Sequence, residues 1–178
     1  FCFTITSSLS GSYNSACAAK QIYESENEGK RVLVIDTLST GPEIALAIEK
    51  VEELVEAGMP YEEICKSITQ YIKRTGLLFM LKSLKSLANN GRVSPIAAKL
   101  VGIVGIGVVG KASNEGTLEQ MHKCRGERRA LETIVTDLEA EGFRSGKITI
   151  GHCRNESAAL QLKELILSKY KNAIIEIH

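Results

Sequence analysis

A hydroxyl-rich segment, Thr-Ser-Ser-Leu-Ser-Gly-Ser-Tyr at residues 6–13, has the residue types best suited to binding chemistry, and we call it the Ser loop. It follows a strand-like run at residues 1–5 and precedes a helix expected over residues 15–25. Hydroxyls, free backbone N–H groups and the positive end of a helix dipole suit a carboxylate or phosphate, which accepts several hydrogen bonds at once. The alternative is an N-cap followed by a turn, which needs a single serine. The Gly-x-Ser-x-Gly order of a hydrolase nucleophile elbow is absent.

A glycine-bearing apolar segment, Gly-Ile-Gly-Val-Val-Gly at residues 105–110, matches the G-x-G-x-x-G pattern of dinucleotide-binding sites. In those sites the pattern ends a strand and opens a helix. Here Lys-Ala-Ser-Asn-Glu-Gly at residues 111–116 follows, which indicates a strand and a hairpin turn. The sequence therefore favours a packed strand, or the lining of an apolar cavity, over a nucleotide-binding enzyme.

Among the charged residues, one arginine and one basic cluster stand out as candidates for binding. Arg92 follows an Asn-Asn-Gly turn and could pair with an anion through its planar guanidinium, or be an ordinary surface residue. A basic cluster at an expected helix start is either a solvated face or a docking patch for an acidic partner; it comprises Lys123, Arg125, Arg128 and Arg129.

No catalytic set emerges from the sequence. We expect His122 and His152 at the surface or in a second layer, because neither has an evident carboxylate or nucleophile companion. Asp36 is the one acid at a strand end, a position typical of sites, and it could equally cap the next loop. The sequence thus predicts neither catalytic residues nor a metal site.

The elements that would position the Ser loop alternate between strands and helices. Strands are expected at residues 1–5, 31–36, 77–81, 108–112, 147–150 and 173–177, and helices at 15–25, 44–55, 60–72, 83–88, 95–104, 127–141 and 156–170. This order predicts an α/β fold of two domains, with mainly parallel sheets flanked by helices. Residues 1–75 would be the remainder of an N-terminal domain and residues 76–178 a C-terminal domain. We expect residues to be missing at the start, and at the end as well, because both ends are strand-like.

Composition limits the function classes. The chain has 178 residues, 44% hydrophobic and 24% charged, with a net charge of +1, which does not favour nucleic acid. The most apolar stretch, residues 96–109, is shorter than the roughly 18 residues of a membrane span. The five cysteines include no C-x-x-C pair, which indicates reduced thiols in a cytoplasmic protein.

Four blocks of the sequence, in order, resemble the DegV family of bacterial fatty-acid-binding proteins. Residues 5–16 are similar to that family's Ser-Ser-x-Leu-Ser-Gly-Thr-Tyr block. Val-Ile-Asp-Thr-Leu-Ser-Thr at residues 34–40 is similar to its next strand and loop. Residues 84–94, ending Gly-Arg-Val-Ser, resemble its Leu-x-Tyr-Leu-x-x-Gly-Gly-Arg-Ile signature, and residues 123–131 resemble a basic helix start.

The resemblance implies two α/β domains with a fatty acid buried in a cleft between them. Hydroxyls of the Ser loop would hold the carboxylate, with Ser7 as first choice, Ser8, Ser10 and Gly11 beside it, and Arg92 nearby. The ligand would be a fatty acid of about 14 to 18 carbons, whose methylenes each contribute about 0.8 kcal/mol on burial. No other cofactor is implied. The protein would be a carrier, not an enzyme, that presents its ligand to a separate fatty-acid kinase for phosphorylation.

The sequence also departs from the family pattern. The family's Thr-Ser-Gln-Pro block would precede residue 1, and its His-x-Gly block would follow His178. Lys82 and Ser83 replace an acidic pair, and residues 106–109 replace Asn-x-Lys-Pro, two changes that bear on pocket shape and acyl preference. The alternative to a lipid carrier is a regulatory or structural α/β domain whose Ser loop only caps a helix.

Overall fold

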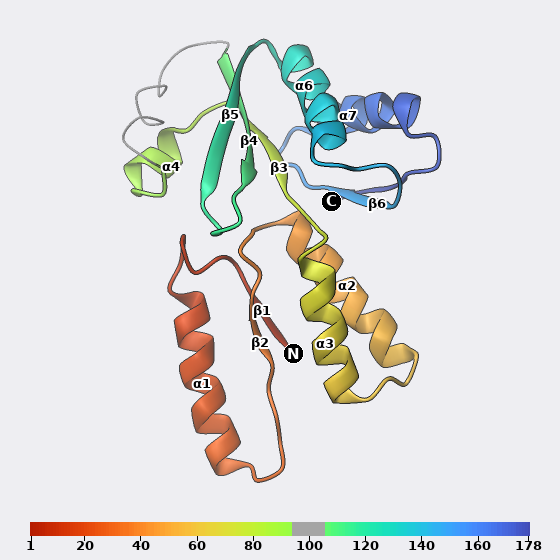
Figure 1. Ribbon diagram of the computed structural model, residues 1–178. Coiled ribbons are helices and arrows are strands. Elements are labelled where there is room, and N and C mark those ends of the chain that lie inside the picture. The colour runs from red at the N-terminus through yellow and green to blue at the C-terminus, as the bar shows by residue number, and fades with distance from the viewer. Residues whose placement is uncertain (94–105) are drawn as a thin grey trace. The chain divides into compact units, whose positions relative to one another are not determined.

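The computed structural model describes residues 1–93 and 106–178, and the chain divides into two units (Figure 1). The first unit is Phe1–Leu77 together with Ala112–Thr117, and the second is Leu78–Lys111 together with Leu118–His178. Each unit has its own sheet and core. The helix expected over residues 95–104 lies outside the described residues.

In the first unit, two short parallel strands are each followed by a loop and a helix. Its elements are β1 (Cys2–Thr4), α1 (Ser12–Glu26), β2 (Val34–Asp36), α2 (Pro42–Glu56) and α3 (Tyr61–Ile72). β1 pairs with β2 in the register Cys2↔Val34 and Thr4↔Asp36. Because the strands are parallel, the Ser loop and the loop at residues 37–41 leave the same edge of this sheet (Figure 1).

The core of the first unit lies where α2 and α3 pack against the two strands. Ala47, Val51, Ile64 and Ile68 are buried there, and Ile68 is completely enclosed. These residues face inward because apolar side chains recur every three or four positions along both helices. α1, in contrast, has no buried residue. The Ser loop that precedes α1 is held by its buried residue Thr6 and by hydrogen bonds.

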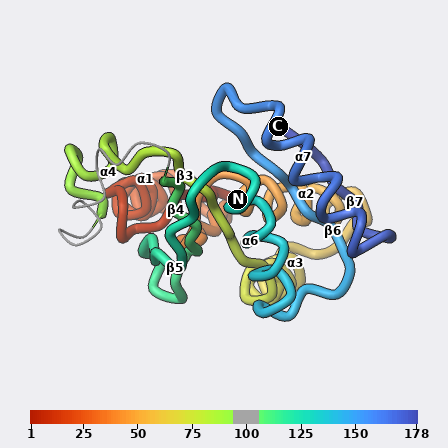
Figure 2. The backbone as a smooth tube through the Cα atoms, turned by 90° about the horizontal axis from the view of Figure 1, so that it is seen from above, coloured from red at the N-terminus to blue at the C-terminus, as the bar shows by residue number. Residues whose placement is uncertain are grey.

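The second unit contains a three-stranded and a two-stranded sheet. Its elements are β3 (Leu78–Leu81), α4 (Lys85–Asn89), β4 (Ile106–Ala112), β5 (Leu118–Arg125), α6 (Glu127–Ala140), β6 (Lys147–Ile150), α7 (Glu156–Lys169) and β7 (Ile174–Ile177). The first sheet has the order β3-β4-β5, with β3 antiparallel to β4. In the second sheet β6 is parallel to β7, and α6 and α7 lie side by side (Figure 2).

Helix α6 contributes to both cores of the second unit. Ala130 and Ile134 pack with Val109 of β4 and Cys124 of β5, while Val135 belongs to a second cluster with residues of β6 and α7. Leu162 of α7 packs against both clusters. The two sheets of this unit are therefore joined through one helix.

The α/β class predicted from the sequence is confirmed, and strand β5 is the main addition. Leu-Glu-Gln-Met-His-Lys-Cys-Arg carries good helix formers and alternates weakly, so its pattern did not indicate a strand. Lys123 and Arg125 consequently lie on β5, whereas the sequence placed them at a helix start. Among the helices of residues 1–93 and 106–178, none is long and apolar enough to cross a membrane.

Candidate functional site

The Ser loop leaves the carboxyl end of β1 as a tight turn built on Thr6, which is 1% exposed. The Thr6 carbonyl accepts the N–H groups of Leu9 (3.1 Å) and Ser10 (3.2 Å), and its hydroxyl accepts the N–H of Ser8 at 3.2 Å. α1 begins at Ser12, whose N–H donates to Ser10 Oγ at 3.2 Å. The helix therefore starts inside the Ser loop, before the expected residue 15.

The three serines predicted to bind a carboxylate have different hydrogen bonds. The Ser8 hydroxyl donates to the backbone carbonyl of Glu115 at 2.8 Å. The Ser10 hydroxyl accepts a backbone N–H and keeps its own proton for another partner. Ser7 is exposed, and its hydroxyl has no hydrogen bond within the described part of the chain. Ser7 and Ser10 can each donate to a ligand, whereas the proton of Ser8 is already engaged.

The amino end of α1 adds a positive electrostatic contribution to this loop. Gly11, and not a serine, is the N-cap residue, and the first turn contains no acidic side chain that would offset the helix dipole. The pKa of the Tyr13 phenol is raised, first by its hydrogen bond with Cys17 and to a smaller extent by the Asp36 carboxylate. The phenol therefore stays neutral and is no competing anion.

Asp36 connects the Ser loop to the loop after β2. Both carboxylate oxygens accept the N–H of Ser7 at 3.2 Å, and Oδ1 also accepts the N–H of Leu38 at 3.1 Å. A backbone bond from Thr6 N–H to the Ser39 carbonyl, 2.9 Å long, joins the same two loops. Of the two roles predicted for Asp36, capping the next loop is therefore observed, and the same carboxylate also holds the Ser loop.

Arg92 belongs to the second unit, while the Ser loop belongs to the first. The Arg92 backbone N–H donates to the Leu87 carbonyl of α4 at 2.9 Å. The Arg92 guanidinium donates to the backbone carbonyl of Asn90. The pairing of Arg92 with a ligand held by the Ser loop stays a prediction.

An apolar pocket lies in the second unit beside the β3-β4-β5 sheet. Side chains from all three strands and from the residue that caps α4 line it, among them Phe79, Leu81, Leu84, Val108 and Leu118. Its free volume of about 20 Å³ holds little more than one water molecule. An acyl chain would enter only if these side chains moved apart.

A larger cleft of about 280 Å³ lies in the first unit, beside the loop that follows β2. Glu43, 7% exposed, lines it, and accepts a hydrogen bond from the Thr75 hydroxyl at 2.5 Å. Lys73 is also part of the wall. Sequence reasoning missed this pair because Glu43 and Thr75 are 32 positions apart.

Residues 106–110 of the glycine segment belong to strand β4, as the packed-strand interpretation predicted, while Gly105 lies outside the described residues. Val108 and Val109 of β4 are buried, and Gly110 lies against its neighbours. A Cβ at Gly110 would lie 2.3 Å from the Glu119 carbonyl oxygen and 2.6 Å from the Phe79 ring. Close packing within the sheet therefore explains this glycine without a nucleotide.

The helical part of the basic cluster is exposed, and its charges are paired within the same helix. Arg128 and Arg129 both pair with Glu132, at 3.1 and 3.8 Å, and their side chains are 85% and 73% exposed. Pairs of this kind contribute little to stability.

His122 has a carboxylate partner that the sequence did not reveal. Its Nε2 lies 3.0 Å from Oδ1 of Asp137 on α6, which is 5% exposed. The other oxygen of Asp137 is buried and has no partner among the described residues. The pair joins β5 to α6, so its first effect is on the packing of the second unit.

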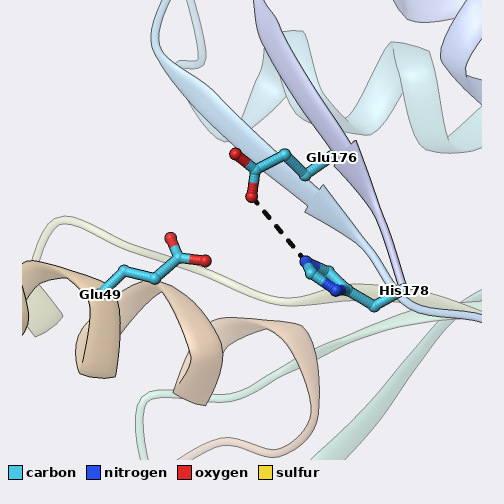
Figure 3. A group of neighbouring side chains, drawn as sticks. All are labelled: Glu49, Glu176 and His178. Carbon is cyan, nitrogen blue, oxygen red and sulfur yellow. Dashed lines mark ion pairs between the residues drawn. The ribbon is translucent and has the colours of Figure 1, made fainter.

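Figure 3 shows another polar group, which contains Glu176 on β7 and His178 directly after that strand. The His178 Nε2 atom lies 3.8 Å from Oε2 of Glu176, and both side chains are substantially exposed. Two exposed ligands are too few for a protein metal site. Glu49, also drawn, belongs to the first unit, so we assign no metal to the group.

Comparison with known families decides the class of the protein. A family model described as "Uncharacterised protein, DegV family" matches residues 1–178. The chain belongs to the DegV family. A DegV domain-containing protein of Streptococcus pyogenes is 40% identical over 173 residues, which are 97% of this chain and 62% of the relative.

Two solved structures share the fold closely. One is a DegV family protein from Eubacterium eligens loaded with heptadecanoic acid, with a TM-score of 0.95 and 39% identity over 98% of this chain and 63% of that one. The other is the Streptococcus pneumoniae Fatty Acid Kinase (Fak) B3 protein loaded with linoleic acid, also with a TM-score of 0.95 and 39% identity. The matched region covers 98% of this chain and 62% of the Fak B3 protein. This chain therefore spans less than two thirds of the length of these relatives.

Proposed function

We propose that the protein binds a long-chain fatty acid and that the Ser loop holds the carboxylate. One observation carries the proposal: Ser7 and Ser10 keep hydroxyl protons for a partner at the amino end of α1, where an anion is favoured. Gly11 brings the first-turn N–H groups to the same place, and Ser8 shapes the loop. Two DegV relatives with the same fold are loaded with fatty acids.

We place Arg92 near the bound carboxylate, because a guanidinium forms strong paired hydrogen bonds with such a group. The acyl chain, of about 14 to 18 carbons, gains about 0.8 kcal/mol per buried methylene before binding costs are counted.

We further propose that the protein is a non-catalytic carrier that presents its ligand to the catalytic subunit of a fatty-acid kinase. Support comes from the Streptococcus pneumoniae relative, which is named as a fatty acid kinase protein. We place the carrier in the cytoplasm, a proposal supported by its five free cysteines.

Extraction and mass spectrometry of the full-length protein, purified under native conditions from a bacterial host, test the binding proposal. We expect one fatty acid per protein, with the preferred chain length read directly from the mass. Protein that carries no fatty acid and takes up neither added palmitate nor added oleate would contradict it and favour a regulatory domain without lipid.

Two substitutions test the site. Ser7→Ala and Arg92→Ala should each weaken fatty-acid binding roughly tenfold while the thermal unfolding midpoint changes little, because both side chains lie outside the cores. Unchanged affinity in both variants would contradict the assignment of these residues.

A further inference from the structure

The turn that joins β4 to β5, residues 113–117, is part of the first unit and has a rigid structure of its own. Ser113 N–H donates to the Thr117 carbonyl at 2.8 Å, and the two hydroxyls of these residues lie 2.8 Å apart. Ser113 Oγ also accepts the N–H groups of Glu115 and Thr117, at 3.2 and 3.1 Å. Internal hydrogen bonds thus hold the β4–β5 turn in one conformation.

The β4–β5 turn contacts the Ser loop at two points. The first is the hydrogen bond from the Ser8 hydroxyl to the Glu115 carbonyl, which spans 107 positions of sequence. The second is steric: a Cβ at Gly116 would lie 2.1 Å from Oγ1 of Thr6 and 3.1 Å from Cα of Leu38. Gly116 also has φ +73°, a conformation that favours glycine. The turn therefore touches both loops that leave the sheet edge.

These contacts reach the atoms that set the shape of the Ser loop. The Thr6 hydroxyl, against which Gly116 lies, accepts the N–H of Ser8. The Ser8 hydroxyl in turn donates its proton to the Glu115 carbonyl. The turn thus holds Ser8 by its side chain and, through Thr6, by its backbone, while Ser7 and Ser10 on either side stay able to donate.

We infer that the β4–β5 turn is a positioning element of the carboxylate site, with Gly116 and Ser8 as its positioning residues and with Ser7 and Ser10 as the hydroxyls that contact the ligand. The inference rests on the proposed fatty-acid function and refines it. Hydroxyls on a loop bind an anion well only if their geometry is held to a fraction of an ångström. α1 cannot supply that precision, because none of its residues is buried.

The first experiment compares Gly116→Ala with Gly29→Ala in the full-length protein. Gly29 has nearly the same φ, +77°, and lies in the same unit, but a Cβ there meets nothing within 4 Å. Both variants have the backbone strain, and only Gly116→Ala displaces Thr6. We expect Gly116→Ala to lower the affinity for linoleate roughly tenfold or more and Gly29→Ala to change it less than about twofold. Equal affinities in the two variants would overturn the inference.

The second experiment decides the matter even if Gly116→Ala does not fold. Ser8→Ala should weaken linoleate binding and speed amide hydrogen exchange in the β4–β5 turn, because the bond to Glu115 is lost. Ser8→Thr keeps the hydroxyl and should restore both properties. Ser7→Ala should weaken binding and leave exchange in the turn unchanged. A Ser8→Ala variant with normal exchange in the turn would contradict a positioning role.

The same data separate this inference from the proposed function. If Ser7→Ala, Ser10→Ala and Ser8→Ala all bind linoleate like the unchanged protein, the Ser loop is not the carboxylate site and both proposals fail. If Ser7→Ala and Ser10→Ala weaken binding but Ser8→Ala and Gly116→Ala do not, the site stands and only the role of the turn is wrong.

Discussion

Two loops of this molecule occupy the same topological position and differ in chemistry. The Ser loop follows β1 of the parallel pair β1–β2, and residues 151–155 follow β6 of the parallel pair β6–β7. Both are tied to the end of the neighbouring strand, the first by Ser7 N–H to the Asp36 carboxylate and the second by His152 N–H to the His178 carbonyl, 3.0 Å long. In each case the parallel strand pair sets the position of the loop, and the side chains of the loop determine what it can bind.

The bonds that fix the two loops also differ. The Ser loop bonds to the loop after β2 and to the β4–β5 turn, and hydroxyl protons stay free. The second loop bonds within itself, through Asn155 N–H to Nδ1 of His152 at 3.3 Å, and to the start of α6, through the Asn155 amide to Glu127 at 3.0 Å. Arg154 there adopts a left-handed φ of 52°. The first loop places hydroxyl donors at the start of a helix whose first turn has no acidic side chain, whereas α7, which follows the second loop, begins with Glu156. This difference supports the first loop as the anion site.

The largest effect on fatty-acid affinity should come from removal of both serine hydroxyls that are proposed to contact the ligand. We expect Ser7→Ala combined with Ser10→Ala to weaken linoleate binding about a hundredfold, equal to about 2.7 kcal/mol, because two hydrogen bonds to a charged group are lost. Cys153→Ser in the second loop is the control and should bind normally. Equilibrium titration measures both, and a loss in Cys153→Ser as large as in the double variant would break the comparison.

Removal of the Asp36 carboxylate should have the next largest effect. Asp36→Ala leaves the N–H groups of Ser7 and Leu38 without their acceptor, so we expect a loss of about 1–2 kcal/mol in the free energy of unfolding. Fatty-acid affinity should fall as well, because the Ser loop loosens. Chemical denaturation with and without linoleate gives both quantities, and an unchanged midpoint without ligand would show that Asp36 does not fix the loop.

A smaller effect is expected in the second loop. Asn155→Ala removes the hydrogen bond from the Asn155 side-chain amide to Glu127. We expect the free energy of unfolding to fall by about 0.5–1.5 kcal/mol and fatty-acid binding to stay unchanged. Denaturation combined with linoleate titration checks this. A binding defect would mean that residues 151–155 take part in the fatty-acid site, so that the two loops would not differ in function.

The smallest expected effect is a pH dependence from Glu127, the residue of α6 to which Asn155 of the second loop donates. Hydrogen bonds from Lys82 and then from Asn155 lower the pKa of Glu127. A lowered folded-state pKa stabilises the protein above the ordinary pKa of glutamate, and that contribution is lost as pH falls through the folded-state value. The difference in stability between the unchanged protein and Glu127→Gln should therefore shrink on acidification. A difference that stays constant with pH would contradict the role of Glu127.

Whether a feature of the site could be predicted from the sequence depends on how far apart its contacting residues are along the chain. The Ser loop and Asp36 were predictable, because a strand, a hydroxyl run and a helix are adjacent in sequence. The bond from Ser8 to Glu115 was not, since no local pattern reports a contact across 107 positions. For the same reason the sequence put Ser7 first but did not separate the role of Ser8 from that of Ser10.

Two further misses have physical causes. His122 and Asp137 meet only because β5 is a strand that faces α6, and β5 itself was hidden by its helix-forming residues. The start of α1 at Ser12 was missed because serines indicate loops as well as helix caps.

Helix α6 has a consequence for how the second unit unfolds. Ile134 and Val135 are adjacent in sequence, yet one is buried in the cluster of the three-stranded sheet and the other in the cluster of β6 and α7. Neither cluster can form while α6 is unfolded, so the two sheets of this unit should lose their order together. The unit should therefore melt cooperatively in one transition, without a populated intermediate in which only one sheet survives.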